Sequence, residues 1–196
     1  MNRLPRDFYL QNTKTLAQKL LGKKLVRIYK NKRISGIITE TEAYLGLKDK
    51  ACHSYGGKRT DRVIPLYMPG GFSYVYFIYG MHYCFNVVAR PEGIPEAVLI
   101  RALEPTEGIE HMMKWRSTTD LKKLTTGPAK LCEALLIDKK LNAKDLLDDE
   151  IFIEDFKSVS SSNIVKSKRI NIAYAEEAAD WPLRYYIKNN LYISKK

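Results

Sequence analysis

The sequence predicts a single mixed α/β (α+β) domain, residues 1–196, built on a largely antiparallel sheet. A chain of 196 residues that is 45% hydrophobic fits one domain with a proper core. Several runs of residues are either rich in aromatic side chains or alternate between apolar and polar ones. They flank short breaks that resemble turns, which is typical of β-hairpins. The order of the runs lacks the regular strand–helix alternation of a doubly wound fold.

The first half of the chain predicts a helix and a long hairpin. Residues 13–21 carry leucines on one side and end before Gly22, as a helix does. Residues 24–30 alternate as a strand, and a turn at Asn31-Lys32 leads into a second strand over 34–44. Residues 46–71, rich in Gly, Ser and charge, predict a loop.

The second half predicts another hairpin, then helices. Two aromatic strands, 72–78 and 83–89, flank a break at 79–82, and an apolar strand follows at 96–103. Helical patterns cover about 106–116 and 128–136. Residues 138–163 read as loop-rich, and two short strands are expected at 183–187 and 191–196.

Several classes of protein lack support in the sequence. No run approaches the roughly 18 apolar residues of a membrane span, and MNRLPRDFYL lacks the apolar region of a signal peptide. Cys52, Cys84 and Cys132 form neither a disulfide framework nor a zinc spacing. No Walker loop and no G-x-S-x-G elbow occurs. We therefore expect a reduced, cytosolic protein that is not secreted.

The charge of the chain is basic and uneven. The formal net charge is +11, and residues 1–36 hold ten Lys/Arg against one acid. A basic surface attracts phosphates without regard to sequence, which favours a nucleic acid as partner. General solubility is the alternative explanation.

Two glutamates stand two residues apart in TETEAYLG, residues 39–46. On a regular strand, one face would carry Ile34, Gly36, Ile38, Glu40, Glu42 and Tyr44. Such a pair is more often the solvated end of a strand. The alternative is a general base at the mouth of a cleft, with the tyrosine as its aromatic wall.

Arg101 lies inside the apolar run VLIRALEP, where a buried guanidinium requires an acidic partner. Glu42 and Glu104 are the candidates by type. An arginine beside Glu42 would hold that carboxylate ionised, as a base requires. The alternative places the arginine head at the sheet edge.

The aromatic hairpin and the histidines complete the candidates. Most of the hairpin aromatics are expected in the core, but Tyr79 stands directly before Gly80 at the break and could wedge between stacked bases. His53, His82 and His111 are far apart and have no ligand at metal spacing, so no metal site is expected.

Together these segments resemble the alkyladenine (3-methyladenine) DNA glycosylases. The resemblance covers nearly the whole chain in the family's order, through LAQKLLGKKLV, GIITETEAYLG, ACHSYGG, SYVYFIYGMHYCFNVV, VLIRALEP, TTGPAKLC and PLRYYI. It implies excision of alkylated or deaminated purines from duplex DNA by hydrolysis of the N-glycosidic bond, in base excision repair. It also implies a curved antiparallel sheet, surface helices and a β-hairpin that protrudes into the minor groove.

The resemblance implies a monofunctional enzyme without cofactor, metal or lyase step. The expected partner is double-stranded DNA that contains damaged purines, with no membrane. The expected state is a monomer in the cytoplasm, nucleoid-associated if the chain is bacterial.

The resemblance also assigns roles at the reacting bond. Glu42 activates the water, Arg101 helps to position the same water, and Tyr79 intercalates. These roles are physically reasonable, because extruding a base costs a few kcal/mol that a wedge can offset. A carboxylate can deprotonate water beside a sugar that develops positive charge.

The base pocket is assigned in the same way. Tyr44, His53 and Tyr76 line it, and stacking is worth about 1–3 kcal/mol per base. Alkylated purines carry positive charge, which favours aromatic faces further. Asn86 is expected to discriminate against unmodified guanine.

The chain departs from the family at residues 60–71, where Thr-Asp-Arg-Val and PGGF replace the common runs. We expect this loop near DNA and therefore a different affinity or lesion preference. Residues 138–170 match only loosely. Two alternatives stay open: a basic nucleic-acid-binding module without catalysis, and a glycosylase-lyase that uses a lysine Schiff base.

Overall fold

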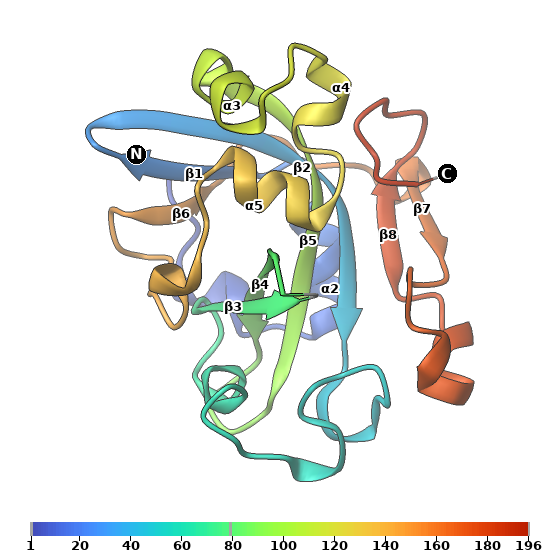
Figure 1. The fold of residues 1–196 in the computed structure, drawn as a ribbon. Helices are drawn as coiled ribbons and strands as arrows, with labels where there is room; N and C mark the ends of the chain where they lie inside the picture. Colours follow the sequence, from blue (N-terminus) through green and yellow to red (C-terminus); the bar gives the residue numbers. More distant parts are fainter. Residues whose placement is uncertain (1, 79, 196) are drawn as a thin grey trace.

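One antiparallel sheet of eight strands organises the molecule, which a computed structural model describes for residues 2–78 and 80–195. The strand order is β3-β4-β5-β2-β1-β6, and β8 pairs with both β2 and β7. The strands are β1 (Lys24–Tyr29), β2 (Lys32–Tyr44), β3 (Ser73–Ile78), β4 (His82–Ala89), β5 (Glu96–Glu107), β6 (Ile151–Glu154), β7 (Ile164–Ser167) and β8 (Arg184–Ile187). The predicted mixed fold with a mostly antiparallel sheet is confirmed (Figure 1).

The helices are short and lie around this sheet. They are α1 (Arg6–Tyr9), α2 (Thr13–Lys19), α3 (Ile109–Arg116), α4 (Leu121–Leu124) and α5 (Pro128–Ala134). Short 3-10 turns occur at Gly46–Lys48, Tyr55–Gly57, Ile64–Tyr67, Lys139–Leu141, Ser161–Asn163 and Ala173–Asp180. Within the described residues, no helix is long and apolar enough to cross a membrane.

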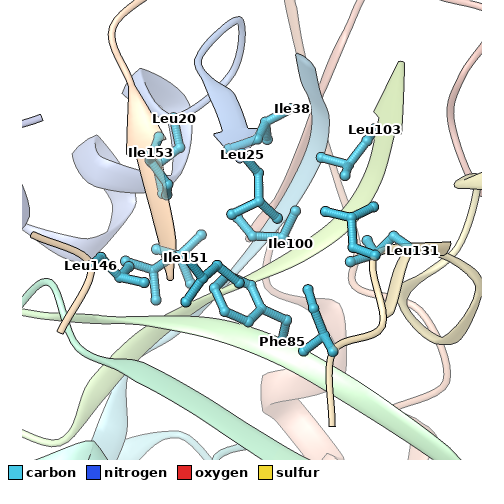
Figure 2. Close-up of a cluster of buried hydrophobic side chains, with 14 of the residues drawn as sticks. Leu20, Leu25, Ile38, Phe85, Ile100, Leu103, Leu131, Leu146, Ile151 and Ile153 are labelled. Atoms are coloured by element: carbon cyan, nitrogen blue, oxygen red, sulfur yellow. The ribbon is translucent and has the colours of Figure 1, made fainter. Parts of the chain in front are cut away.

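A single large hydrophobic cluster holds the sheet to its helices. Leu20, just past α2, and Leu131 of α5 join Phe85 of β4 and Ile100 of β5 in this cluster. Figure 2 shows these side chains gathered in the core between the strands and helices. All four are fully buried, and each contributes roughly 1.5–3 kcal/mol by leaving water.

The first hairpin closes one residue earlier than predicted. Lys30 and Asn31 both have positive φ, 47° and 61°, and they connect Tyr29 to Lys32. Two consecutive residues with positive φ form a type I′ turn, whose twist matches that of the flanking strands. Asparagine tolerates this conformation well, so the sequence correctly predicted a hairpin turn that includes Asn31.

The long strand β2 is irregular where its character changes. Ile38 pairs with Leu103 and Glu40 with Ala102, so Thr39 is an extra residue on β2. Thr41 then pairs with Ile100, so Arg101 is an extra residue on β5. Each extra residue interrupts the alternation of faces.

The expectation that one face of β2 carries both the isoleucines and the glutamates is therefore wrong. Ile38 and Ala43 lie in the core cluster, and the Thr41 hydroxyl donates to the carbonyl of Ala17 next to them. Glu40 and Glu42 consequently point away from the core, on the opposite side of the strand. The bulge at Thr39 thus keeps the apolar half of β2 in the core and turns the acidic half of β2 to the opposite side of the strand.

Other differences concern the ends of elements. β5 continues to Glu107, so the helix expected from about 106 begins at Ile109, after Gly108 with φ 69°. β6 and β7 lie in or next to the segment expected to be loop-rich, and residues 191–195 form no strand. β8 instead pairs with β7 and with the acidic end of β2.

Candidate active site

A cleft and a smaller inner cavity adjoin the acidic end of β2. The cleft has a volume of about 340 Å³ and the cavity about 40 Å³. Four side chains line both, namely Tyr44, His53, Tyr76 and Tyr174. The described residues contain no group of three or more His, Cys, Asp or Glu side chains placed to hold a metal ion.

Glu42 is fully buried next to this cleft, bonded to its lining residues Tyr44 and Arg101, and accepts three hydrogen bonds. The Tyr44 hydroxyl donates to its Oε2 at 2.9 Å, and Arg101 Nη1 donates to the same oxygen at 3.3 Å. The backbone N–H of Ile170 donates to Oε1 at 2.8 Å. Donors from three segments thus fix the orientation of the carboxylate.

Arg101 reaches both glutamates from the bulge in β5. Its Nε lies 3.2 Å from Glu40 Oε1 and its Nη1 3.3 Å from Glu42 Oε2. Burial acts to lower the pKa of Arg101, but the carboxylates of Glu42 and Glu40 outweigh it and raise that pKa above its ordinary value. The predicted pairing with Glu42 is correct, whereas Glu104 accepts from Asn190 at 3.4 Å.

Glu40 is not at a solvated strand end, and that interpretation of the pair was wrong. Its side chain is fully buried, like that of Glu42. Arg184 Nε of β8 donates to Glu40 Oε1 at 2.6 Å, and Ser194 Oγ donates to the same oxygen at 2.9 Å. The C-terminal part of the chain covers this end of the strand, which local alternation in β2 cannot reveal.

Sequence reasoning also missed Arg169, which anchors the far side of the site. Its guanidinium forms a bidentate, fully buried ion pair with Asp49, at 2.6 and 2.8 Å. The same guanidinium donates to the carbonyl of Ala43 at 3.0 Å and lies 4.7 Å from the centre of the Tyr44 ring. Since Ile170 follows directly, this anchor holds the backbone N–H that meets Glu42.

The aromatic residues of the predicted base pocket are brought together. The rings of His53 and Tyr76 lie 4.6 Å apart, nearly perpendicular, and Tyr44 lines the same two hollows. His53 Nδ1 shares a hydrogen bond of 2.8 Å with the Tyr74 hydroxyl. Burial, with Arg62 and Lys58 nearby, lowers the pKa of His53 to about 4, so the imidazole is neutral near pH 7.

Asn86, predicted to discriminate against guanine, lines the inner cavity. It is 3% exposed and its amide nitrogen donates to the carbonyl of Tyr74 at 3.0 Å. This hydrogen bond fixes the plane of the amide. Tyr174, an exposed aromatic on the rim of both hollows, was not predicted, because only its tertiary position marks it.

Tyr79, the predicted wedge, lies outside the described residues. The flanking pair Ile78 and His82 closes the hairpin of β3 and β4. Next to the tip, Phe77 is 46% exposed and Met81 is 68% exposed. The hairpin therefore presents large apolar side chains to solvent.

The basic N-terminal segment is largely neutralised by acids from elsewhere. Six of its ten cations form ion pairs with carboxylates of residues 107–155, namely Arg3, Arg6, Lys23, Lys24, Arg27 and Arg33. Much of the +9 charge of residues 1–36 thus compensates the acidic region around β6. Closer to the cleft, Lys58 and Arg62 act on His53, and Arg62 lies 5.5 Å from the centre of the Tyr76 ring.

The chain is similar over nearly its full length to known proteins. The family model for methylpurine-DNA glycosylase (MPG) matches residues 7–191. A "Putative 3-methyladenine DNA glycosylase" of Desulfitobacterium hafniense is 50% identical over all of both chains. Proteins of the same name from Clostridium acetobutylicum and Bacillus cytotoxicus are 51% and 49% identical, over at least 97% of each chain.

Proposed function

The chain belongs to the methylpurine-DNA glycosylase family, and from this premise we propose that it excises damaged purines from duplex DNA by one hydrolytic step centred on Glu42. Membership makes it a DNA glycosylase of base excision repair. The observation that carries the assignment to Glu42 is its position, a buried carboxylate bonded to Tyr44 and Arg101, two residues that line the aromatic cleft. A module that only binds DNA would have no use for such a group.

In the proposed reaction, Glu42 takes a proton from a water molecule as the water oxygen attacks C1′ of the sugar. The bond between C1′ and the base nitrogen breaks, and its electron pair leaves with the purine. For an alkylated, cationic purine this yields a neutral leaving base. The carboxylate also stabilises the positive charge that develops on the sugar. Arg101 holds the water and the carboxylate of Glu42 in position relative to each other.

The flipped purine would stack against the aromatic walls of the cleft, Tyr44 on one side and His53 with Tyr76 on the other. Stacking of a base on an aromatic ring contributes about 1–3 kcal/mol. A neutral His53 supports this role, because an imidazolium would repel a cationic purine. The depressed pKa of His53 therefore suits a pocket that receives positive charge.

Asn86 would select against guanine from the inner cavity. Its amide plane is fixed by the Tyr74 carbonyl, so it cannot rotate freely to accommodate the exocyclic amine. An unmatched buried donor costs about 1–3 kcal/mol, enough for substantial discrimination. The exposed Phe77 and Met81 support insertion of the hairpin into DNA, with Tyr79 as the wedge.

We assign the phosphate contacts mainly to the loop that holds Lys58 and Arg62, rather than to residues 1–36. The loop lies next to His53, whereas most cations of the N-terminal segment are paired within the protein. The proposed partner is double-stranded DNA with damaged purines, bound by a monomer in the cytoplasm.

The test is a panel of labelled duplexes, each with one 3-methyladenine, hypoxanthine or ethenoadenine, beside an undamaged duplex. We expect free base from at least one damaged duplex and an intact abasic strand. Tight binding with no release would favour the non-catalytic module. An adduct trapped by borohydride would favour the lysine-dependent lyase.

A further inference from the structure

Glu40 joins three separate parts of the chain behind the catalytic arginine. Its Oε1 accepts from Arg101 Nε at 3.2 Å, from Arg184 Nε at 2.6 Å and from Ser194 Oγ at 2.9 Å. The backbone N–H of Ser194 donates to the other carboxylate oxygen. A fully buried carboxylate thus has both oxygens occupied by groups from β5, β8 and the C-terminal segment.

Ser194 also contacts the arginine directly. Arg101 Nε and Nη2 donate to the Ser194 hydroxyl at 3.4 and 3.3 Å. The neighbouring backbone is fixed as well, since Arg184 Nη2 donates to the carbonyl of Lys195 and the Thr39 hydroxyl donates to that of Tyr192. In Figure 1 the C-terminal end lies beside β7 and β8, where it can make these contacts.

The charges of the cluster balance. Glu40 and Glu42 carry two negative charges, and Arg101 and Arg184 carry two positive charges. Arg184 supports Glu40 more closely than Arg101 does, at 2.6 Å against 3.2 Å. Glu40 therefore keeps a cation of its own and does not depend on Arg101 alone.

The division of the Arg101 donors has a chemical consequence. A guanidinium next to a carboxylate tends to form a bidentate pair, which would place two of its N–H groups on the oxygens of Glu42. Here Glu40 and Ser194 hold Nε and Nη2, so that only Nη1 reaches Glu42, at 3.3 Å. Glu42 therefore keeps the positive charge of Arg101 beside it without forming a bidentate ion pair.

We propose that Glu40 and Ser194 are positioning residues that hold Arg101 to a single contact with Glu42, so that the C-terminal segment takes part in building the active site. This inference rests on the proposed function. It assigns to the first glutamate of TETEAYLG, and to a serine 154 residues away, a role in the rate of base release.

The sharpest test replaces Ser194, because Glu40→Gln would leave two buried arginines short of a partner and could unfold the protein. Ser194→Ala removes the hydroxyl that both Glu40 and Arg101 contact. We expect the single-turnover rate of base release to fall about tenfold, while affinity for lesion DNA stays within twofold. Ser194→Thr keeps the hydroxyl and should restore the rate.

Ser167→Ala is the matched control. Its hydroxyl accepts from Arg184 Nη1 at 3.3 Å, so it touches the same cluster without reaching Glu40 or Arg101. We expect a wild-type rate from this variant. Equal losses in the two serine variants would overturn the proposal, because they would report a general disturbance of Arg184.

A double-mutant cycle separates positioning from stability. In an Arg101→Lys background, Ser194→Ala should cause no further loss, since the donors that it positions are gone. A full tenfold loss in that background, or a wild-type rate for Ser194→Ala alone, would overturn the proposal. If the wild type releases no base from any lesion duplex, the proposed function fails instead, and the two failures are thereby distinguished.

Discussion

The buried ion pair between Arg169 and Asp49 allows a quantitative prediction, because the substitution Asp49→Asn changes almost nothing but charge. Both side chains are fully buried, and Arg169 donates two hydrogen bonds to the carboxylate. In the variant, an amide N–H₂ would face guanidinium N–H groups, which cannot accept. The cation would be left without its counterion in a low-dielectric site.

The magnitude follows from the burial. Removing one partner of a buried pair costs about 3–5 kcal/mol of the free energy of unfolding. For a chain of this size each kcal/mol shifts Tm by about 2–4 °C, so we expect a drop of about 6–20 °C. Base release should also fall, because the anchored segment carries the Ile170 N–H that donates to Glu42.

The assay is thermal unfolding followed by circular dichroism, with a control at the ion pair of Lys168, the residue before Arg169. Lys168 and Asp180 form an ion pair in which the side chains are 67% and 73% exposed. Asp180→Asn makes the same chemical change there, and a surface pair is worth only about 0–1 kcal/mol. Equal Tm values for the two variants would refute the reasoning from burial.

Three further predictions concern pH, salt and the hairpin. The pKa of His53 is lowered to about 4 in the folded protein. Between about pH 6.5 and 4, the unfolded chain therefore binds a proton at this histidine that the folded protein does not bind. The free energy of unfolding should therefore fall by up to about 3 kcal/mol between pH 6.5 and 4 in urea titrations, and this slope should shrink in His53→Asn. Lys58→Ala should reduce the slope of log affinity against log salt by about 0.9, whereas Lys24→Ala, which loses an ion pair with Glu107, should leave it unchanged. Tyr79→Ser should weaken base extrusion, and equal lesion affinity in that variant would remove the wedge.

Most of the sheet could be predicted from the sequence because its strands carry strong local signals. The aromatic runs that became β3 and β4 are examples, and the first turn was predicted only one residue away from its position at Lys30 and Asn31. The pairing of Arg101 with Glu42 was also accessible, since a buried guanidinium must have an acidic partner. These inferences rest on chemistry that is visible within a few residues.

The remaining features depend on contacts between distant segments. The extra residues Thr39 and Arg101 leave no mark in the alternation of the sequence, yet they direct Glu40 and Glu42 away from the core. Ser194 lies 154 positions from the carboxylate that it binds. One clue was present, because Arg184 interrupts the apolar run PLRYYI just as Arg101 interrupts VLIRALEP.

The central claim is that Glu42 is the base for hydrolysis, and Glu42→Gln tests it most directly. The measurement is the single-turnover rate of base release, with lesion affinity measured in parallel and Glu104→Gln as the control. We expect the rate of Glu42→Gln to fall by about 10²–10⁴ while lesion binding and the control rate are retained. A Glu42→Gln rate within about threefold of wild type would contradict the account, since general-base catalysis contributes at least about 10².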